Sequence, residues 1–219
     1  MKKHKKALGT PIVVLGMHRS GTSLVAGILR NAGVLMGDKF LPPDEFNLRG
    51  YFEDTDFLWI NKGILESAGA SWYAPPTVEL ILSRGEKFRR IAQKTIAEKR
   101  TKAKRKSWGW KDPRNCLTCW VYSEFIQDAK FIVVVRNPMD IRLSLLKAHG
   151  DLANWDSVIN LYYASVDKFL QMHKNQSLNV SFEELTYKKY SKETCTKILT
   201  FINKSNKFID KIWSGIDFR

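Results

Sequence analysis

The chain has 219 residues, of which 44% are hydrophobic, and its formal net charge is +14. This length allows one substantial hydrophobic core and argues against a second folded domain, and no apolar run is long enough to cross a membrane. We therefore expect a basic N-terminal tail over residues 1–9 and a single domain over residues 10–219.

The N-terminus does not match a secretory signal. Residues 1–6 are basic, but the apolar run that follows is short and continues directly into a glycine-containing loop. The chain has three cysteines, an odd number, which favours reduced thiols over a disulfide framework. These features predict a cytoplasmic protein.

The first predicted strand, Pro11–Leu15, is followed by the sequence Gly-Met-His-Arg-Ser-Gly-Thr-Ser over residues 16–23. Its spacing is that of a P-loop, in which glycines let backbone N–H groups converge on an anion at a helix N-terminus. Thr22 replaces the lysine that nucleoside triphosphatases direct at the β- and γ-phosphates, and Arg19 supplies a positive charge within the loop. This substitution argues against ATP as the ligand.

The remaining elements alternate along the chain. After the loop we predict a helix over 22–31, then an irregular Pro- and Gly-containing segment over 41–50 that leads through Tyr51–Glu53 into a helix over 56–68. Further elements are expected as helices over 79–104, 115–127, 139–149, 153–173 and 191–203, and strands over 107–111, 130–135 and 178–182.

This alternation predicts an α/β fold with three layers, a mainly parallel β-sheet flanked by helices on both faces. Ligands of such sheets bind at the carboxyl ends of the strands. The Gly16 loop and Arg136 both directly follow a predicted strand. The two are therefore expected at the same edge of the sheet.

The segment around Arg136 carries a second motif. A continuous apolar strand over 130–135 ends at Arg136-Asn137-Pro138, Pro138 suits the first turn of a helix, and Ser144 lies eight residues after the arginine. This pattern resembles the sulfotransferases that use 3′-phosphoadenosine 5′-phosphosulfate (PAPS). The resemblance implies that Arg136 and Ser144 bind the 3′-phosphate of the donor.

Three other segments extend the resemblance, which covers roughly residues 10–185. The family's first loop has a K/R-S-G-T core that holds the 5′-phosphosulfate, and this chain has Arg19-Ser20-Gly21-Thr22 there. The segments 108–114 and 47–53 look like the bacterial and carbohydrate-type branch. The glycine- and lysine-rich loop near the C-terminus of cytosolic sulfotransferases is not recognisable, so the 3′-phosphate site would be completed differently.

The resemblance also implies a reaction. Sulfuryl transfer requires in-line positioning of donor and acceptor and neutralisation of developing charge, and we expect no metal. Loop N–H groups with the Thr22 and Ser23 hydroxyls would hold the 5′-phosphate, and Arg19 or Lys111 would stabilise charge on the leaving oxygen. The alternative for Lys111 is an ordinary lysine at a strand end.

An acceptor hydroxyl must lose its proton, which calls for a general base. We select Glu53, since the base of carbohydrate- and tyrosyl-protein-type sulfotransferases is commonly a glutamate. The alternative role for Glu53 is a helix-start carboxylate that interacts with the helix dipole. Cytosolic-type enzymes use histidine, and among the histidines of this chain His149 is the alternative base.

Two further features have competing interpretations. The basic segment 84–111 carries more charge than the donor needs, which indicates an acidic acceptor, a nucleic acid, an anionic membrane surface or only a solvated helix face. Cys116 and Cys119 form a C-x-x-C pair, but no second pair completes a zinc site, so both are expected to face the core.

The sequence thus predicts a PAPS-dependent sulfotransferase that acts on an acceptor hydroxyl and releases adenosine 3′,5′-bisphosphate. A carbohydrate is the favoured acceptor, followed by a lipid or a small metabolite, and nucleic acid is a less favoured partner. One alternative is a P-loop nucleotide kinase, against which Thr22 argues. Another is a non-catalytic binder of acidic glycan or nucleic acid, which would leave Arg136 and Ser144 unexplained.

Overall fold

The computed structural model describes residues 9–40, 51–214 and 216. The basic residues 1–8 and the segment 41–50, which includes Asn47–Gly50 of the predicted motif, lie outside the described residues.

One parallel sheet organises the described residues. Its strands are β1 (Pro11–Leu15), β2 (Trp108–Lys111), β3 (Lys130–Val135) and β4 (Ser177–Ser181), in the spatial order β2-β1-β3-β4. In the register Val14 lies beside Lys111 and Leu15 beside Val133. The carboxyl ends of β1, β2 and β3 therefore meet at one edge of the sheet, as predicted.

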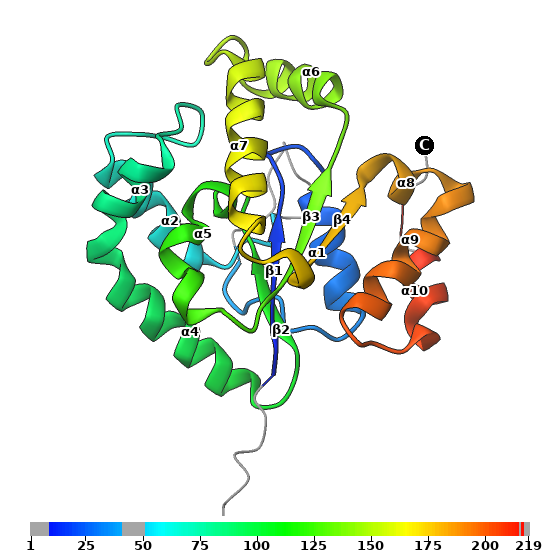
Figure 1. The fold of residues 1–219 in the computed structure, drawn as a ribbon. Coiled ribbons are helices and arrows are strands. Elements are labelled where there is room, and N and C mark those ends of the chain that lie inside the picture. The colour runs from blue at the N-terminus through cyan, green and yellow to red at the C-terminus, as the bar shows by residue number, and fades with distance from the viewer. Residues whose placement is uncertain (1–8, 41–50, 215, 217–219) are drawn as a thin grey trace, which may run out of the picture.

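Helices cover both faces of this sheet, which confirms the three-layer α/β fold (Figure 1). Side chains of β1 alternate between the two cores, with Val13 and Leu15 in one and Ile12 and Val14 in the other. The first core is covered by α2 (Thr55–Ser67), α3 (Val78–Gly85), α4 (Arg89–Ala103), α5 (Asn115–Tyr122) and α7 (Trp155–Leu170). The second is covered by α1 (Thr22–Asn31), α8 (Phe182–Thr186), α9 (Lys188–Phe201) and α10 (Ile209–Ser214).

Helix α6 (Pro138–His149) follows β3 and lies at the top of Figure 1, beyond the carboxyl ends of the strands. Pro138 occupies its first turn, and the Asn137 side chain caps the helix by accepting a hydrogen bond from the Met139 N–H. This local sequence places Ser144 close to the edge where the predicted ligand sites meet.

The predicted single helix over 79–104 is wrong. The structure contains α3, a 3₁₀ turn (Glu86–Phe88) and α4 in its place. At the end of α3, Gly85 lies so close to α5 that an added Cβ would be 2.6 Å from Val121 Cγ2. Because this close approach is a tertiary contact, the charged helical pattern gave no sign of it.

The other boundaries differ by smaller amounts. The predicted helix over 115–127 ends as α5 at Tyr122 and continues as a 3₁₀ turn (Ser123–Phe125), and that over 153–173 is shorter, as α7. The short helices α8 and α10 were not predicted. Helix α8 begins directly after β4 because the Ser181 side chain accepts a hydrogen bond from the Glu184 N–H. In the part of the chain that the structure describes, no helix has the length and apolarity needed to span a bilayer.

Candidate active site

The loop between β1 and α1 has the backbone geometry that its glycines require. Gly16 has φ +150°, and a Cβ there would lie 2.8 Å from Val134 O. Gly21, at the N-cap of α1, has φ +97°, and its Cβ would lie 2.2 Å from the Phe182 ring. Side chains at both positions would be strained and would collide with neighbours. In the first turn of α1 the Leu24 N–H donates to the Gly21 carbonyl at 3.0 Å, whereas the Thr22 and Ser23 N–H groups have no acceptor within the described chain and are available to an anion.

A buried cysteine anchors the start of this loop. The Gly16 N–H donates to Cys116 Sγ at 3.1 Å, and burial raises the pKa of the Cys116 thiol to about 12. Cys116 and Cys119 both face the core as predicted, and the three cysteines, Cys195 included, are buried and free. Cys116 therefore holds the start of the loop against α5.

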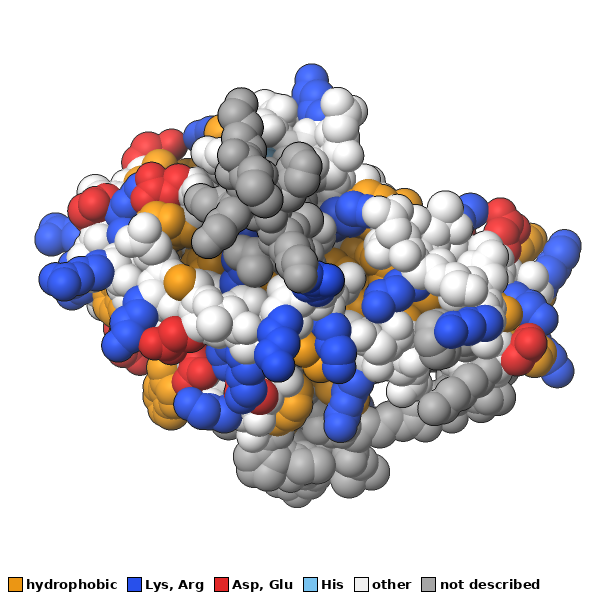
Figure 2. Space-filling model, turned by 90° about the horizontal axis from the view of Figure 1, so that it is seen from below, with side chains coloured by type: hydrophobic (Ala, Val, Ile, Leu, Met, Phe, Trp, Pro, Cys, Tyr) orange, Lys and Arg blue, Asp and Glu red, His pale blue; other side chains and the backbone are white. Residues whose placement is uncertain are grey.

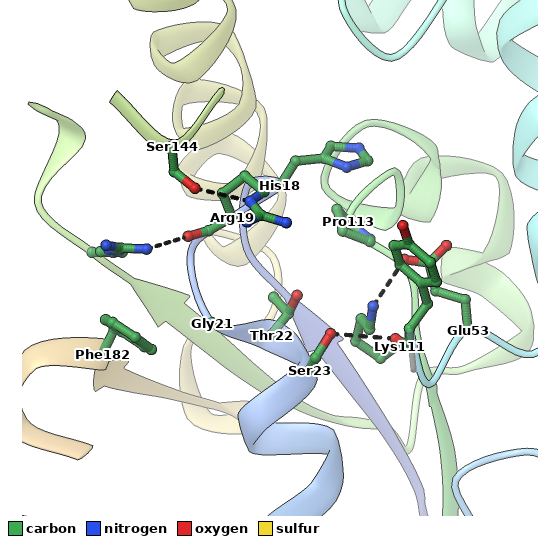
Figure 3. Close-up of a pocket in the computed structure, with 12 residues that line it drawn as sticks. His18, Arg19, Gly21, Thr22, Ser23, Glu53, Lys111, Pro113, Ser144 and Phe182 are labelled. Atoms are coloured by element: carbon green, nitrogen blue, oxygen red, sulfur yellow. Dashed lines mark hydrogen bonds and ion pairs between the residues drawn. The ribbon is translucent and has the colours of Figure 1, made fainter. Parts of the chain in front are cut away.

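The two predicted phosphate sites meet in space (Figure 3). The Arg136 Nη1 donates to the backbone carbonyl of Arg19 at 2.8 Å, and the Arg19 Nε donates to Ser144 Oγ at 2.9 Å, across 117 and 125 residues of sequence. These residues line one cavity of about 300 Å³ with Thr22 and Ser23. Ser20, also predicted at the site, is fully buried and is not among the lining residues.

Glu53 and Lys111 form a buried ion pair at the wall of the same cavity. Lys111 Nζ lies 2.8 Å from Glu53 Oε1, and the two side chains are 2% and 6% exposed. Lys111 is therefore not an ordinary strand-end lysine with its ammonium in water. The N-cap of α2 is Asp54, which accepts from the Asp56 N–H, so the helix-start role belongs to Asp54 and leaves Glu53 to the cavity.

Behind this ion pair lies a polar network in which Arg114 and Asp112, within the segment 108–114 of the resemblance, are joined by Asn61, which sequence analysis did not identify. Arg114 Nη1 lies 2.9 Å from Asp112 Oδ1 and 3.4 Å from Glu53 Oε2. Burial opposes the charge of Arg114, but Asp112 and Glu53 hold the pKa of its guanidinium above the ordinary value.

At the centre of the network is the buried Asn61 of α2. Its amide donates to Asp112 Oδ2 and Asn115 Oδ1, both at 2.9 Å, and its carbonyl accepts from Thr118 Oγ1 at 2.7 Å and Tyr122 OH at 2.8 Å. Asn61 thereby fixes Asp112, which fixes Arg114, which contacts Glu53.

Two histidines lie near the cavity. His18 lines it, and its ring centroid lies 4.4 Å from that of Trp72 with the rings tilted by 39°. Its Nε2 is buried and has no hydrogen-bond partner among the described residues. Burial, followed by the charges of Arg114 and Lys111, lowers the pKa of His18 well below 6.5. His149, the alternative base of the sequence analysis, contacts Trp72 from the other side but is not a lining residue.

Four of the described lining residues were not predicted as site residues: His18, Tyr51, Pro113 and Phe182. The Phe182 ring lies 4.6 Å from the Arg136 guanidinium. A signal for Phe182 was present in the sequence, since it ends the last predicted strand, 178–182, and strand carboxyl ends share one edge of the sheet.

The basic segment does not reach this cavity as one surface. Lys99 pairs with Asp38, Asp54 and Asp56, and Arg100 pairs with Asp128. Residues 104–106 precede β2 and so lie at the amino ends of the strands, on the opposite edge from the cavity. This placement does not support the expectation that these residues draw an acceptor into the site.

The described chain combines a parallel α/β sheet, a glycine loop at a helix N-terminus and a cavity at the strand carboxyl ends that is lined by Arg19, Lys111 and Arg136. These features define a P-loop-type α/β fold with a cavity whose charge suits an anion. Comparison with known proteins assigns it further. A model of the sulfotransferase family matches residues 11–204, so the chain belongs to the sulfotransferase family and is an enzyme. None of the curated protein sequences matches it.

Solved sulfotransferases share the fold. The sulfotransferase domain of the Synechococcus PCC 7002 olefin synthase is similar with a TM-score of 0.61 and 17% identity, over 98% of this chain and 81% of that domain. Sulfotransferase STF9 from Mycobacterium avium has a TM-score of 0.56 at 12% identity, over 95% of this chain and 68% of its own. A sulfotransferase from Alicyclobacillus acidocaldarius has a TM-score of 0.54 at 13% identity, over 92% of this chain and 83% of its own.

Proposed function

We propose that the protein transfers the sulfuryl group of PAPS to an acceptor hydroxyl. The observation that carries the proposal is the convergence of two separate phosphate-type motifs, Arg19 in the loop and Arg136 with Ser144, on one cavity whose wall is the Glu53–Lys111 pair. The cavity thus combines two anion sites with a carboxylate and a cation of the kind that proton and sulfuryl transfer need.

The lining residues fit the donor. The loop N–H groups with the Thr22 and Ser23 hydroxyls suit the 5′-phosphosulfate, and Arg136 with Ser144 suits the 3′-phosphate. Phe182 offers a ring face to a purine at the same cavity. The buried Ser20 Oγ, which has no partner in the described residues, lies beneath the loop and is a further donor for the anion that the loop binds.

The donor assignment is tested by thermal unfolding with nucleotides. Adenosine 3′,5′-bisphosphate should stabilise the protein by ~2.7 kcal/mol at a hundred times its dissociation constant, whereas AMP and ATP should stabilise it much less at equal concentration. Arg136→Ala should lose this preference, because a hydrogen bond to a charged group contributes roughly 1.5–3 kcal/mol. Arg142→Ala, on helix α6 that begins two residues after Arg136, is the matched control. Equal shifts with AMP would refute the assignment.

In the proposed reaction the acceptor oxygen forms a bond to sulfur while the bond from sulfur to the bridging oxygen of the donor breaks. The bridging oxygen keeps the electron pair and leaves on adenosine 3′,5′-bisphosphate. Lys111 and Arg19 neutralise the charge on this oxygen, and Glu53 takes the hydroxyl proton.

The base assignment is tested by Glu53→Gln, which keeps the shape and removes the basicity. Turnover should fall about 10²–10⁴-fold, while affinity for the bisphosphate stays within a few-fold of wild type. Glu66→Gln, an exposed glutamate on α2, is the matched control. A near-normal rate for Glu53→Gln would direct the test to His149→Ala.

For the acceptor, a carbohydrate hydroxyl is favoured, then a lipid or a small metabolite, on the sequence resemblance of segment 108–114. The kinase alternative makes the opposite prediction about ligands, namely that ATP stabilises the protein more than the bisphosphate does. The non-catalytic alternative predicts that no sulfuryl transfer accompanies binding.

A further inference from the structure

A second cleft lies at the opposite edge of the sheet from the active site. We call it the amino-edge cleft, and its volume is about 350 Å³. It is lined by residues at the amino ends of β1, β2 and β3 and by the turn after α9: Thr10, Ile12, Arg105, Lys106, Ser107, Lys130, Ile202, Asn203 and Lys204.

The cations of this cleft come from three separate parts of the chain. Arg105 and Lys106 belong to the turn before β2, Lys130 opens β3, and Lys204 follows α9. None of the lining residues is acidic. Figure 2 faces this side of the molecule and shows Lys and Arg side chains gathered across its middle. The concentration of charge is therefore a product of the fold and not only of one basic run.

Ion pairing separates these cations from the basic residues just before them. Lys99 and Lys102, on α4, both contact Asp38. Within the described residues, Arg105, Lys106 and Lys204 have no carboxylate within ion-pair distance. The cations that line the cleft are thus not neutralised by carboxylates of the described chain.

Lys130 adds an observation independent of the surface charge. Its ammonium is half-buried and donates to the neutral carbonyl of Phe201 at the end of α9. Burial lowers the pKa of this lysine, because a cation that has lost water and gained no carboxylate is disfavoured. An anion in the cleft would compensate this charge.

The uncharged lining side chains also suit an anion. The Thr10 and Ser107 hydroxyls and the Asn203 amide can all donate hydrogen bonds, and within the described chain these side chains have no hydrogen-bond partner. The volume is within the range of about 300–1,000 Å³ typical of small-ligand sites. We propose that the amino-edge cleft binds a multiply charged phosphate-bearing group, at a site separate from the sulfuryl-transfer cavity.

This group has two chemical sources, a free polyphosphate-type anion or the headgroup of an anionic lipid. Residues 2–6 add four lysines to the sequence just ahead of Gly9, whose backbone N–H donates to Lys104 O beside the cleft. Both sources would be attracted by this charge, and both would be weakened by salt.

The test measures binding of inorganic pyrophosphate by calorimetry, and of phosphatidylcholine vesicles with and without phosphatidylserine by co-sedimentation. The cleft variant is Lys106→Gln with Lys204→Gln. The matched control is Lys188→Gln with Lys189→Gln, which removes the same charge from the other end of α9. The variant Arg19→Gln with Arg136→Gln removes binding of pyrophosphate to the active-site cavity. Pyrophosphate binding that this variant retains therefore belongs to the cleft.

We expect one of the two probes to bind about tenfold or more weakly to the cleft variant, with near-normal binding to the control. Loss of pyrophosphate binding identifies a free anion, and loss of vesicle binding identifies a headgroup. The proposal is overturned if neither probe binds the full chain, or if the cleft variant and the Lys188/Lys189 control lose binding equally.

Discussion

The buried Glu53–Lys111 pair allows a quantitative test by a double-mutant cycle. Both side chains are almost fully buried, and their charged atoms lie 2.8 Å apart. Removing one member of a buried pair leaves the other charge uncompensated, which costs about 3–5 kcal/mol. Glu53→Leu should have this full effect, because Lys111 then has no carboxylate in the described cavity.

Lys111→Met should cost less, about 2 kcal/mol, because Arg114 still contacts Glu53 at 3.4 Å and methionine preserves the length of the side chain. The double variant should be less destabilised than the two single changes added together, with a coupling energy of about 2 kcal/mol.

Urea unfolding of the four proteins measures this coupling, provided that the dependence on urea concentration is unchanged. Lys94 and Glu98 supply the comparison, since they form an exposed i,i+4 pair at 3.8 Å on α4 whose coupling should be about 0.5 kcal/mol or less. If the Glu53 and Lys111 effects add within about 0.5 kcal/mol, the two charges are not a buried pair and the described wall of the cavity is wrong.

Three further outcomes are expected. Gly21→Ala should lower the melting temperature and weaken bisphosphate binding, because its Cβ meets Phe182, whereas Gly33→Ala, also at positive φ but with open space around it, should cost only the backbone strain. Because the folded state holds the pKa of His18 well below 6.5, the unfolded chain protonates this histidine at a higher pH than the folded chain does. The free energy of unfolding should therefore fall by up to about 1.4 kcal/mol per pH unit as pH drops below 6.5, and His18→Phe should flatten this dependence. Cys116, with its raised pKa and full burial, should react with iodoacetamide only after unfolding, and rapid native alkylation would contradict the described anchor.

The parts of the site that sequence analysis identified are those whose chemistry is local. The loop over 16–23 is recognisable from the spacing of its two glycines and from its hydroxyl side chains. Ser144 is placed by a helix that begins at Pro138. That the loop and Arg136 share one edge was predicted from the parallel sheet, because its strands end at the same edge, and the hydrogen bond from Arg136 to the Arg19 carbonyl agrees with this.

The parts that sequence analysis missed depend on contacts between distant segments. Asn61 supports the site through hydrogen bonds to four side chains that lie between 51 and 61 positions further along the sequence. An asparagine within a helix gives no local sign of such contacts. The break at Gly85 likewise reflects its contact with α5. The position of residues 104–106 could have been predicted from the sequence, since a turn that precedes a strand lies at the amino end of that strand. The hypothesis of an acidic acceptor rested instead on the total positive charge of the segment.

Transfer of sulfur from labelled PAPS tests the central claim most directly. The protein is incubated with the labelled donor and an extract of its native organism, and the products are resolved by mass spectrometry. The account predicts a sulfated acceptor that forms in step with adenosine 3′,5′-bisphosphate and is lost with Glu53→Gln. An intact donor, or a phosphorylated product made from ATP by the same protein, would contradict it.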